Sequence, residues 1–293
     1  MRCVLVANPW ASRVTERRLA AVRAALPPGT EVRLTSARGE ATELARELSG
    51  RVDALYVFGG DGTYNEVLNG IDANTPLGLL PGGGTSVLPR ALGLPPDPVA
   101  AARRLAGAGA RSRRISLGRV NGHRFGFACG IGLDAEVVRA VDELGRRADG
   151  RRPGNAVFAW TALRTLARHR LRLEPALEVV GHGRAAFAIV SNGPVYTFAG
   201  PVPVRPTPEA TFEGGLDLLA PARVRARDLA RLGWWAAGLG ARAGVPDLVY
   251  LHDADRIEIA CDRPLPLEAD GEDLGDVEHV VLEAERGAAT VLV

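Results

Sequence analysis

The stretch that most constrains the fold runs from Val52 to Ile71 and reads VDALYVFGGDGTYNEVLNGI. Residues 52–58 are mostly apolar and predict a buried strand, and the glycine-rich turn after them leads into a helical pattern. Thr63 and Glu66 lie three residues apart, which predicts a capping box at the start of that helix. Glycines let backbone N–H groups approach an anion beside the positive end of a helix dipole. The stretch therefore predicts a phosphate-binding loop; the alternative is a tight turn that binds nothing.

A second glycine-rich loop follows the next predicted strand. Residues 77–80 form a short apolar run, Pro81 ends it, and Gly82 to Thr85 reads GGGT before another helical segment. Two such loops at neighbouring strand ends can hold one triphosphate between them. The alternative interpretation is a flexible loop without a ligand.

Strands and helices alternate in the first part of the chain. Strands are predicted at residues 2–7, 31–34 and 52–58, with helices at 16–26 and 40–48 between them. This alternation is typical of a Rossmann-like parallel sheet with right-handed crossovers, which binds its ligands at the carboxyl ends of the strands. The polar residues expected at that edge are Asn8, Thr35, Asp61 and Thr85.

The pattern changes near Arg114. From Ile115 onward, short alternating stretches bounded by Gly, Asn or Pro predict an antiparallel β-sandwich. The predicted fold class is therefore α/β plus all-β, with an α/β domain over residues 1–114 and a β-sandwich domain over residues 115–293.

Helices are also predicted within the second domain. They lie at residues 135–144, which Asp134 would cap, at residues 158–173, which carry several arginines, and at residues 223–239, which include Trp234 and Trp235. The default for the last two is packing on the sandwich or a solvated face. The alternative is docking on anionic lipid headgroups.

The composition excludes several classes of protein. The sequence contains no lysine, which excludes a Walker-type phosphate loop and Schiff-base chemistry, because both need a lysine amine. A formal net charge of +2 argues against a dedicated nucleic-acid binder. The three cysteines are far apart and the five histidines show no zinc spacing, so a reduced, cytoplasmic protein is expected. No apolar run reaches membrane-spanning length, which leaves at most a peripheral contact with the inner face of the membrane.

Two of these strings resemble motifs of the diacylglycerol kinase catalytic-domain family. The GGDGT run at residues 59–63, followed by Asn65-Glu66 and Asn69-Gly70, is similar to the signature of these lipid kinases, which include sphingosine and ceramide kinases. Gly84-Thr85 resembles part of the family's second motif, although Ser86-Val87 stands where Asn-Asp is usual.

A third string lies near the carboxyl end of the chain, where residues 267–272 read LEADGE. Alternation predicts a strand that ends in a hairpin tip, and a tip without chemistry is the neutral interpretation. Two carboxylates spaced by one glycine can lie on the same side of such a turn, where one accepts a hydroxyl proton and the other helps to hold Mg²⁺. Asp-Gly-Glu is also a motif of the lipid-kinase family, and the resemblance makes Asp270 the general base.

The resemblance implies an ATP- and Mg²⁺-dependent kinase whose active site lies in the cleft between its two domains. Its acceptor would be the hydroxyl of diacylglycerol or of another long-chain alcohol. The residues that the resemblance places at the nucleotide are Asn8, Thr35, Gly59, Gly60, Gly62, Thr63, Glu66, Gly84 and Thr85. The implied catalytic residues are Asp270, Asp61 and Glu272, of which Asp61 and Glu272 also position Mg²⁺. Residues 213–217 read EGGLD where the family usually has Asp-Gly-x-Leu-Asp, so the resemblance leaves open whether a structural cation is bound near Glu213.

Two other functions are considered. An NAD kinase would have a similar sheet and GGDGT loop, but Asn65-Glu66 and Asn69-Gly70 favour the lipid branch. A noncatalytic sensor of nucleotide or lipid is suggested by the substitutions at Ser86-Val87 and Glu213. The expected partner is a lipid at a membrane surface; nucleic acid is not expected, and a homodimer is left open.

Overall fold

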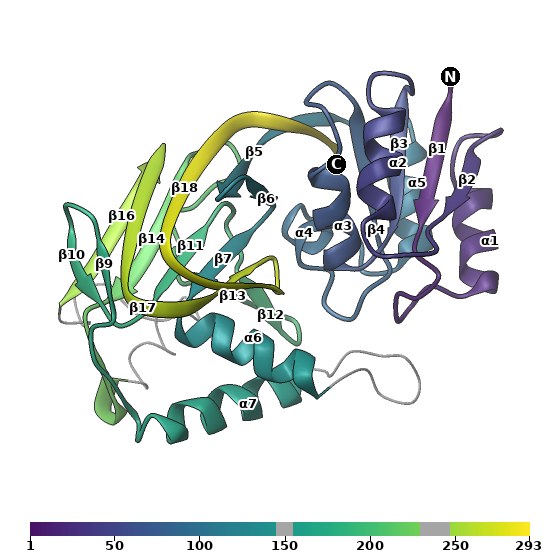
Figure 1. Cartoon of the computed structure of the whole chain (residues 1–293). Helices are drawn as coiled ribbons and strands as arrows, with labels where there is room; N and C mark the ends of the chain where they lie inside the picture. The colour runs from purple at the N-terminus through teal and green to yellow at the C-terminus, as the bar shows by residue number, and fades with distance from the viewer. Residues whose placement is uncertain (145–154, 229–246) are drawn as a thin grey trace. The chain divides into compact units, whose positions relative to one another are not determined.

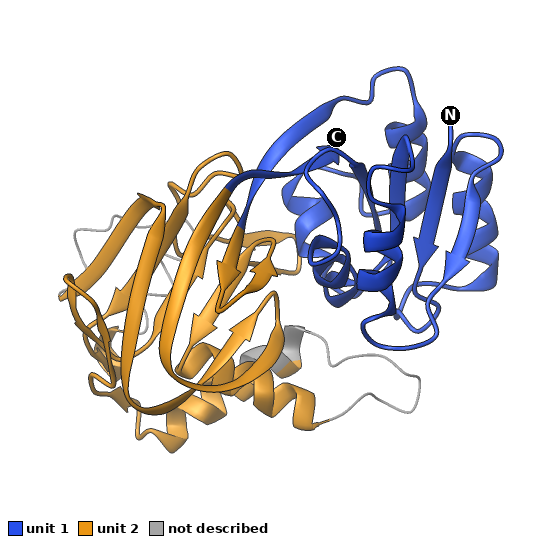
Figure 2. Cartoon of the chain, turned by 45° about the horizontal axis from the view of Figure 1, so that its top comes forward, with its two compact units in different colours: residues 1–117, 286–293 blue, residues 118–285 orange. Residues whose placement is uncertain are grey.

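The computed structural model describes residues 1–144, 155–228 and 247–293. The loop predicted at residues 149–153 and most of the helix predicted at residues 223–239, with Trp234 and Trp235, lie outside the described residues. The chain divides into two compact units (Figure 2). Unit 1 comprises residues 1–117 and 286–293, and unit 2 comprises residues 118–285. Within the described residues, no helix is both long and apolar enough to cross a membrane.

Unit 1 is built on a parallel sheet (Figure 1). Its strands follow the order β18-β4-β3-β1-β2, and each neighbouring pair is parallel. The parallel sheet was predicted, but the place of β18 in it was not. The strands are β1 (Cys3–Ala7), β2 (Glu31–Leu34), β3 (Ala54–Gly59), β4 (Pro76–Pro81) and the last residues of β18 (Glu272–Leu292). The helices are α1 (Glu16–Ala25), α2 (Glu40–Leu48), α3 (Asp61–Leu68), α4 (Val87–Ala91) and α5 (Pro98–Ala106).

Local chemistry explains these elements. Every residue of β1 and β3 is buried, as expected for central strands of a parallel sheet with both faces covered. Helix α1 begins after Thr15, whose hydroxyl accepts a hydrogen bond from the Arg18 N–H, and α5 begins after Asp97, which caps the Ala100 N–H in the same way.

Unit 2 is built on antiparallel strands, also as predicted (Figure 1). Its main strand order is β16-β14-β11-β7-β17-β18. The strands before β14 are β5 (Ser112–Val120), β6 (His123–Phe125), β7 (Ala128–Ile131), β8 (Arg172–Leu173), β9 (Leu177–Val179), β10 (Gly183–Ala185), β11 (Ala188–Ser191), β12 (Thr197–Ala199) and β13 (Val202–Val204). The later strands are β14 (Leu216–Pro221), β15 (Val224–Arg225), β16 (Leu248–Ala254), β17 (Arg256–Ala269) and β18.

Two helices accompany this sheet. Helix α6 (Leu133–Glu143) packs against β7 and β17, and α7 (Asn155–Arg168) packs on α6. Apolar residues that alternate along β7, β11, β14, β17 and β18 form one buried cluster, which is the core of the unit.

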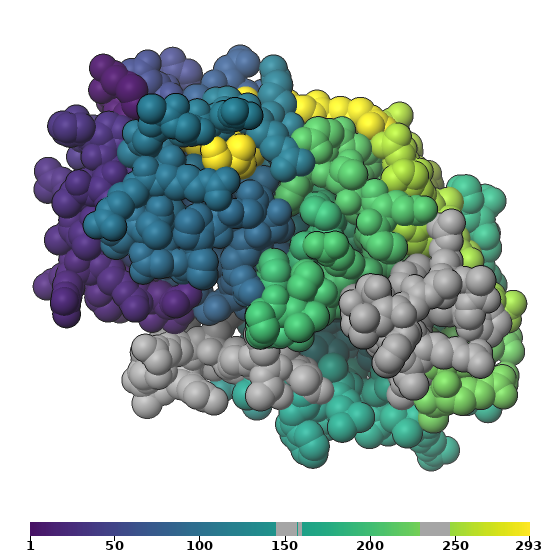
Figure 3. Space-filling model, turned by 180° about the vertical axis from the view of Figure 1, so that it is seen from behind, coloured from purple at the N-terminus to yellow at the C-terminus, as the bar shows by residue number. Residues whose placement is uncertain are grey.

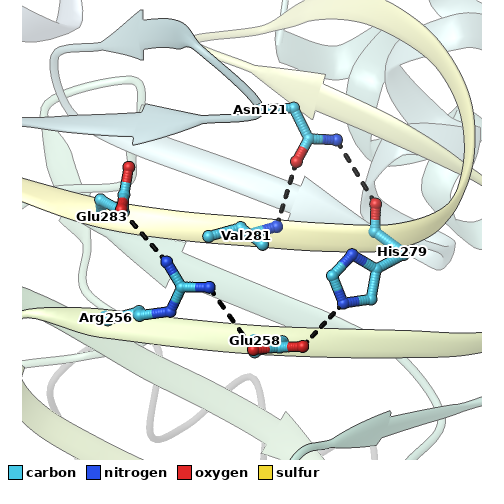
Figure 4. Close-up of polar contacts among 6 residues, drawn as sticks. All are labelled: Asn121, Arg256, Glu258, His279, Val281 and Glu283. Carbon is cyan, nitrogen blue, oxygen red and sulfur yellow. Dashed lines mark hydrogen bonds and ion pairs between the residues drawn. The ribbon is translucent and has the colours of Figure 1, made fainter.

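A long hairpin of β17 and β18 spans unit 2. Polar pairs link the two strands: Arg256 contacts Glu283, and Glu258 lies between Arg256 and the His279 ring (Figure 4). The Asn121 side chain accepts a hydrogen bond from the Val281 N–H and donates one to the His279 carbonyl. Cross-strand pairs of this kind favour one register over its neighbours.

The chain passes between the units within β5 and again within β18. The predicted boundary at Arg114 falls inside β5, before the observed division after Leu117. The second crossing was not predicted: residues 286–293 belong to unit 1 and not to the second domain. The physical reason is parallel pairing, because Thr290 and Val291 extend the sheet beside β4. In Figure 3 the yellow atoms of the chain's end show among the blue atoms of unit 1.

Candidate active site

The two glycine loops of unit 1 touch each other at the carboxyl ends of β3 and β4. The Gly82 N–H donates to the Gly59 carbonyl over 2.7 Å. A Cβ on Gly83 would lie 2.7 Å from the Gly60 Cα, which is closer than real Cβ contacts come. The buried hydroxyl of Tyr64 lies 2.7 Å from the carbonyl oxygens of both Gly59 and Leu80, and burial raises its pKa, so it stays a neutral donor. Glycine is therefore required for the approach of the loops.

The start of α3 differs from the prediction. The N-cap is Gly60, which has no side chain that could cap the helix, and the helix begins at Asp61. Thr63 lies in the first turn, and its hydroxyl accepts a hydrogen bond from Asn8 Nδ2 over 3.0 Å. Glu66 accepts instead from the Ala41 N–H, at the start of α2, over 3.2 Å. The predicted capping box is wrong, because the N-cap is three residues earlier than Thr63 and the first N–H groups of the helix are left to other acceptors.

Asp61 links the two loops. Its Oδ1 accepts from the Val87 N–H, at the start of α4, over 2.7 Å. The preceding residue, Ser86, has a left-handed backbone with φ of 50°, and its hydroxyl accepts from the Gly83 N–H over 3.2 Å. The Ser86-Val87 pair, which departs from the family pattern, thus orders the second loop through its own hydrogen bonds.

The other predicted nucleotide residues lie at this edge or beside it. The Asn8 N–H donates to the Phe58 carbonyl, and the Thr35 N–H donates to the Ala7 carbonyl, each over 3.0 Å. Thr35 is buried, Thr85 is half-buried and Gly84 is exposed. The edge therefore combines exposed and half-buried loop residues, a helix start without a side-chain cap, and buried hydroxyls behind them. This arrangement fits a phosphate chain.

Two arginines beside the loops were not singled out from the sequence. The backbone N–H of Arg13 donates to the Gly82 carbonyl over 2.9 Å, and Arg90 Nη1 lies 3.4 Å from the Thr85 carbonyl. Burial lowers the pKa of Arg90, the charge of Asp61 raises it, and the charge of Arg13 lowers it further. The two guanidinium groups thus give the loops a positive potential in a chain without lysine. The positions of the two arginines could have indicated them, because each one follows a turn that is predicted at the end of a strand.

The predicted catalytic hairpin tip lies in unit 2. Asp270 is 3% exposed, and its carboxylate accepts from three backbone N–H groups: Gly126 at 2.6 Å, Phe127 at 2.9 Å and Ala128 at 3.2 Å. These bonds use three of about four acceptor positions of a carboxylate. Glu272 is half-buried and opens β18. The tip therefore presents one rigidly held carboxylate, with a second close by in the chain.

A buried acid group lies under this tip. Glu268 is 2% exposed, and its Oε2 accepts from the Gly271 N–H over 2.8 Å. Burial, together with the charge of Asp134, raises the pKa of Glu268 well above its ordinary value. Asp134 itself accepts from the Tyr196 hydroxyl, and burial raises its pKa as well. Two carboxyls this close do not both ionise readily, so the pair retains a proton.

Asp134 therefore does not have the predicted role. Helix α6 begins at Leu133, and its N-cap is Gly132 and not Asp134. Hydrogen bonding to Tyr196 turns the Asp134 carboxyl toward Glu268 instead.

The region near Glu213, where a structural cation was left open, contains a pairing of Asp217 with His252. Asp217 is 1% exposed and accepts from His252 Nδ1 at 2.9 Å and from the Asp253 N–H at 3.1 Å. This hydrogen bond raises the pKa of His252. Glu213 is exposed. Among the described residues, no group of three or more His, Cys, Asp or Glu side chains could hold a metal ion, and the cation stays a prediction.

Comparison with known proteins shows which family part of the chain resembles. Residues 2–120 match the family model of the diacylglycerol kinase catalytic domain. A diacylglycerol kinase of Bacillus subtilis is 37% identical over 116 residues, which cover 38% of this chain and 38% of that protein. A diacylglycerol kinase of Staphylococcus saprophyticus is 39% identical over 100 residues, which cover 33% of this chain and 32% of that protein. These matches span 38% or less of the length of the curated relatives.

Solved structures share the fold along the chain. A diacylglycerol kinase from Bacillus anthracis has a TM-score of 0.72 and 21% identity, with 99% of this chain and 96% of that chain covered. An NAD kinase from Archaeoglobus fulgidus in complex with ATP has a TM-score of 0.53 and 14% identity, with 99% and 92% covered. At these identities the likeness concerns the fold alone, and it confirms the predicted fold class.

Proposed function

Since the chain belongs, through residues 2–120, to the diacylglycerol kinase catalytic-domain family, we propose that it is an ATP- and Mg²⁺-dependent lipid kinase. The acceptor would be the hydroxyl of diacylglycerol or of another long-chain alcohol. The observation that carries the proposal is the contact of the two glycine loops, with Asp61 bonded across them. In the reaction, the lipid oxygen forms a bond to the γ-phosphorus, the bond to the β-phosphate oxygen breaks, and ADP leaves.

The nucleotide would lie on unit 1. The open N-terminus of α3 and the glycine loops bring backbone N–H groups to the phosphates, and Arg13 and Arg90 balance their charge. Mg²⁺, when bound, would neutralise charge on the transferred phosphoryl group. It commonly binds through one or two carboxylates together with substrate phosphates, and Asp61 and Glu272 are the residues that would hold it.

The acceptor hydroxyl would lose its proton to Asp270. Three backbone N–H groups hold this carboxylate in one orientation, so little reorganisation is needed when the hydroxyl arrives. The same bonds compete with the hydroxyl proton for the lone pairs of this carboxylate. General-base catalysis of this kind typically contributes about 10²- to 10⁴-fold in rate.

We further propose that the protein binds the membrane surface that carries its lipid substrate through the exposed face of α7. Trp160 is 65% exposed and Leu163 is 54% exposed, and Arg164 and Arg168 are exposed on the same helix face. The sequence has no acidic residue from 155 to 173. Exposed Trp and Leu beside arginines fit an anionic interface.

Vesicle sedimentation tests this contact. Wild type should bind phosphatidylglycerol vesicles more strongly than phosphatidylcholine vesicles, and the double variant Trp160→Ser, Leu163→Ser should lose most of that binding. Equal binding of the variant and the wild type would exclude the α7 face.

The lipid-kinase proposal is tested by incubating the protein with γ-labelled ATP, Mg²⁺ and a total lipid extract in mixed micelles. An organic-soluble labelled product supports it and supplies the acceptor for identification. Labelled NADP, formed with NAD in place of lipid, would instead support the NAD kinase alternative, for which the shared fold is the favouring observation. ATP binding without any transfer would support the sensor.

A further inference from the structure

The turn that carries Asp270 and Glu272 is a short link between two long strands. β17 ends at Ala269 and β18 begins at Glu272, while Asp270 and Gly271 have φ of 51° and 80°. Two left-handed residues in succession are typical of a tight hairpin turn that matches the twist of its strands. The turn fixes its own backbone, but neighbouring elements decide where its side chains point.

Two attachments hold the tip through backbone groups. Asp270 accepts from the N–H groups of residues 126–128, which connect β6 to β7 and include the first residue of β7. Glu268 accepts from the Gly271 N–H, which ties the end of β17 to the turn. Both attachments fix Asp270, and neither of them involves the side chain of Glu272.

A third attachment comes from α6. Arg139 donates to Asp273 through Nε and Nη2, each over 2.9 Å, and its Nη1 lies 2.7 Å from Asp276 Oδ1. The Gly275 N–H also donates to Asp273, over 3.1 Å. A paired two-point contact of this type fixes direction as well as distance.

The pairing of β18 sets the direction of Glu272, and the Arg139 contact holds this part of β18 against α6. Glu272 and Asp273 are consecutive residues of β18, paired with Ala269 and Glu268 of β17. Successive side chains of a strand point to opposite faces of the sheet. With Asp273 held against α6 by Arg139, the side chain of Glu272 must face away from α6.

We propose that Arg139 is a positioning residue for phosphoryl transfer: by holding Asp273 against α6, it aims Glu272 and fixes the turn that carries Asp270. This inference rests on the lipid-kinase function proposed above. Arg139 does not touch the reacting atoms in this account. Its removal leaves the nucleotide loops of unit 1 intact and lowers the turnover number.

The competing explanation is a surface ion pair that contributes only to stability. Such pairs are worth about 0–1 kcal/mol, and Arg139 is one third exposed. Arg256 provides a matched control, because it also pairs with two acidic residues of this hairpin, Glu258 and Glu283 (Figure 4). It lies at the start of β17, at the other end of the strand from the tip. A purely structural role predicts the same behaviour for both arginines.

The test compares Arg139→Gln, Arg139→Lys and Arg256→Gln in the full chain. Misplacement of a catalytic group by about 1 Å can cost 10²-fold, so we expect Arg139→Gln to lower kcat about tenfold with an unchanged KM for ATP. Arg139→Lys, which keeps the charge but loses the fork, should recover part of the loss. Arg256→Gln should match wild type in kcat.

A second measurement is independent of activity. Amide hydrogen exchange of residues 270–275 should be faster in Arg139→Gln and unchanged in Arg256→Gln. Wild-type kcat and exchange in Arg139→Gln, or equal losses in the two Gln variants, would overturn the proposal. If wild type phosphorylates no lipid, the lipid-kinase function fails, and the exchange measurement still decides whether Arg139 holds the turn.

Discussion

The contact between the two glycine loops gives a sharp prediction for Gly83→Ala. The added Cβ would lie 2.7 Å from the Gly60 Cα, 0.7 Å short of the 3.4 Å at which ordinary contact begins. The obstacle is backbone, so no side chain can move aside and the loops themselves must separate. Overpacking of this size costs about 1–3 kcal/mol. Since 1.4 kcal/mol is about a factor of ten in affinity, we expect the dissociation constant for ATP to rise about tenfold.

The assay is calorimetric titration with ATP, with a thermal melt to establish that each variant is folded. Gly60→Ala is a graded comparison, because its Cβ would lie 3.4 Å from the Gly83 Cα and should cost less. Gly109→Ala is the neutral control, since within the described residues no atom lies within 4 Å of its added Cβ. A folded Gly83→Ala that binds ATP like wild type would refute the assignment of the phosphates to these loops.

Three further predictions concern ionisable side chains. Glu66→Ala should lower the free energy of unfolding by about 0.5–2 kcal/mol, because Glu66 caps α2. The KM for ATP should stay unchanged. A large rise in this KM would indicate that Glu66 contacts the nucleotide. Because the folded-state pKa of Glu268 is raised, the stability supplied by its neutral form is present at low pH and is lost as the pH rises through that pKa. Glu268→Gln keeps a neutral acceptor, so in urea unfolding it should gain stability relative to wild type from pH 5 to pH 8, and a difference independent of pH would contradict this. The pKa of His252 is raised by its hydrogen bond to Asp217, so that stabilisation is complete below about pH 6.5 and is lost as the pH rises through the folded-state value. In Asp217→Asn the NMR titration midpoint of His252 should fall, and an unchanged midpoint would remove Asp217 as the cause.

Much of unit 1 could be predicted because its signals are local. The continuous apolar runs of β1 and β3, and the glycine turns after β3 and β4, indicate from adjacent residues that a strand ends in a turn and that a helix follows. Parallel alternation then places Asn8 and Thr63 at one edge, where they form a hydrogen bond. The change to short alternating stretches after Arg114 likewise reflects a local property of antiparallel strands.

The misses involve partners that are distant in sequence. The spacing of Thr63 and Glu66 matches a capping box, but the Ala41 N–H is a better-placed partner for Glu66, and only the folded sheet brings it near. Asp134 has the local pattern of a helix cap, but its carboxyl accepts a hydrogen bond from Tyr196, which is distant in sequence. The return of residues 286–293 to unit 1 and the hold of Arg139 on Asp273 depend on tertiary pairing in the same way. The periodic spacing of apolar residues in the sequence does not indicate such contacts.

The central claim is transfer of the γ-phosphoryl group to a lipid hydroxyl with Asp270 as the base. The most direct measurement is a time course with purified diacylglycerol in mixed micelles, γ-labelled ATP and Mg²⁺, in which ADP and organic-soluble label are counted together for wild type and Asp270→Asn. The account predicts equal amounts of the two products from wild type. For Asp270→Asn it predicts a rate lower by about 10²-fold or more, with ATP affinity retained. ADP without organic-soluble label, or a variant as fast as wild type, would contradict it.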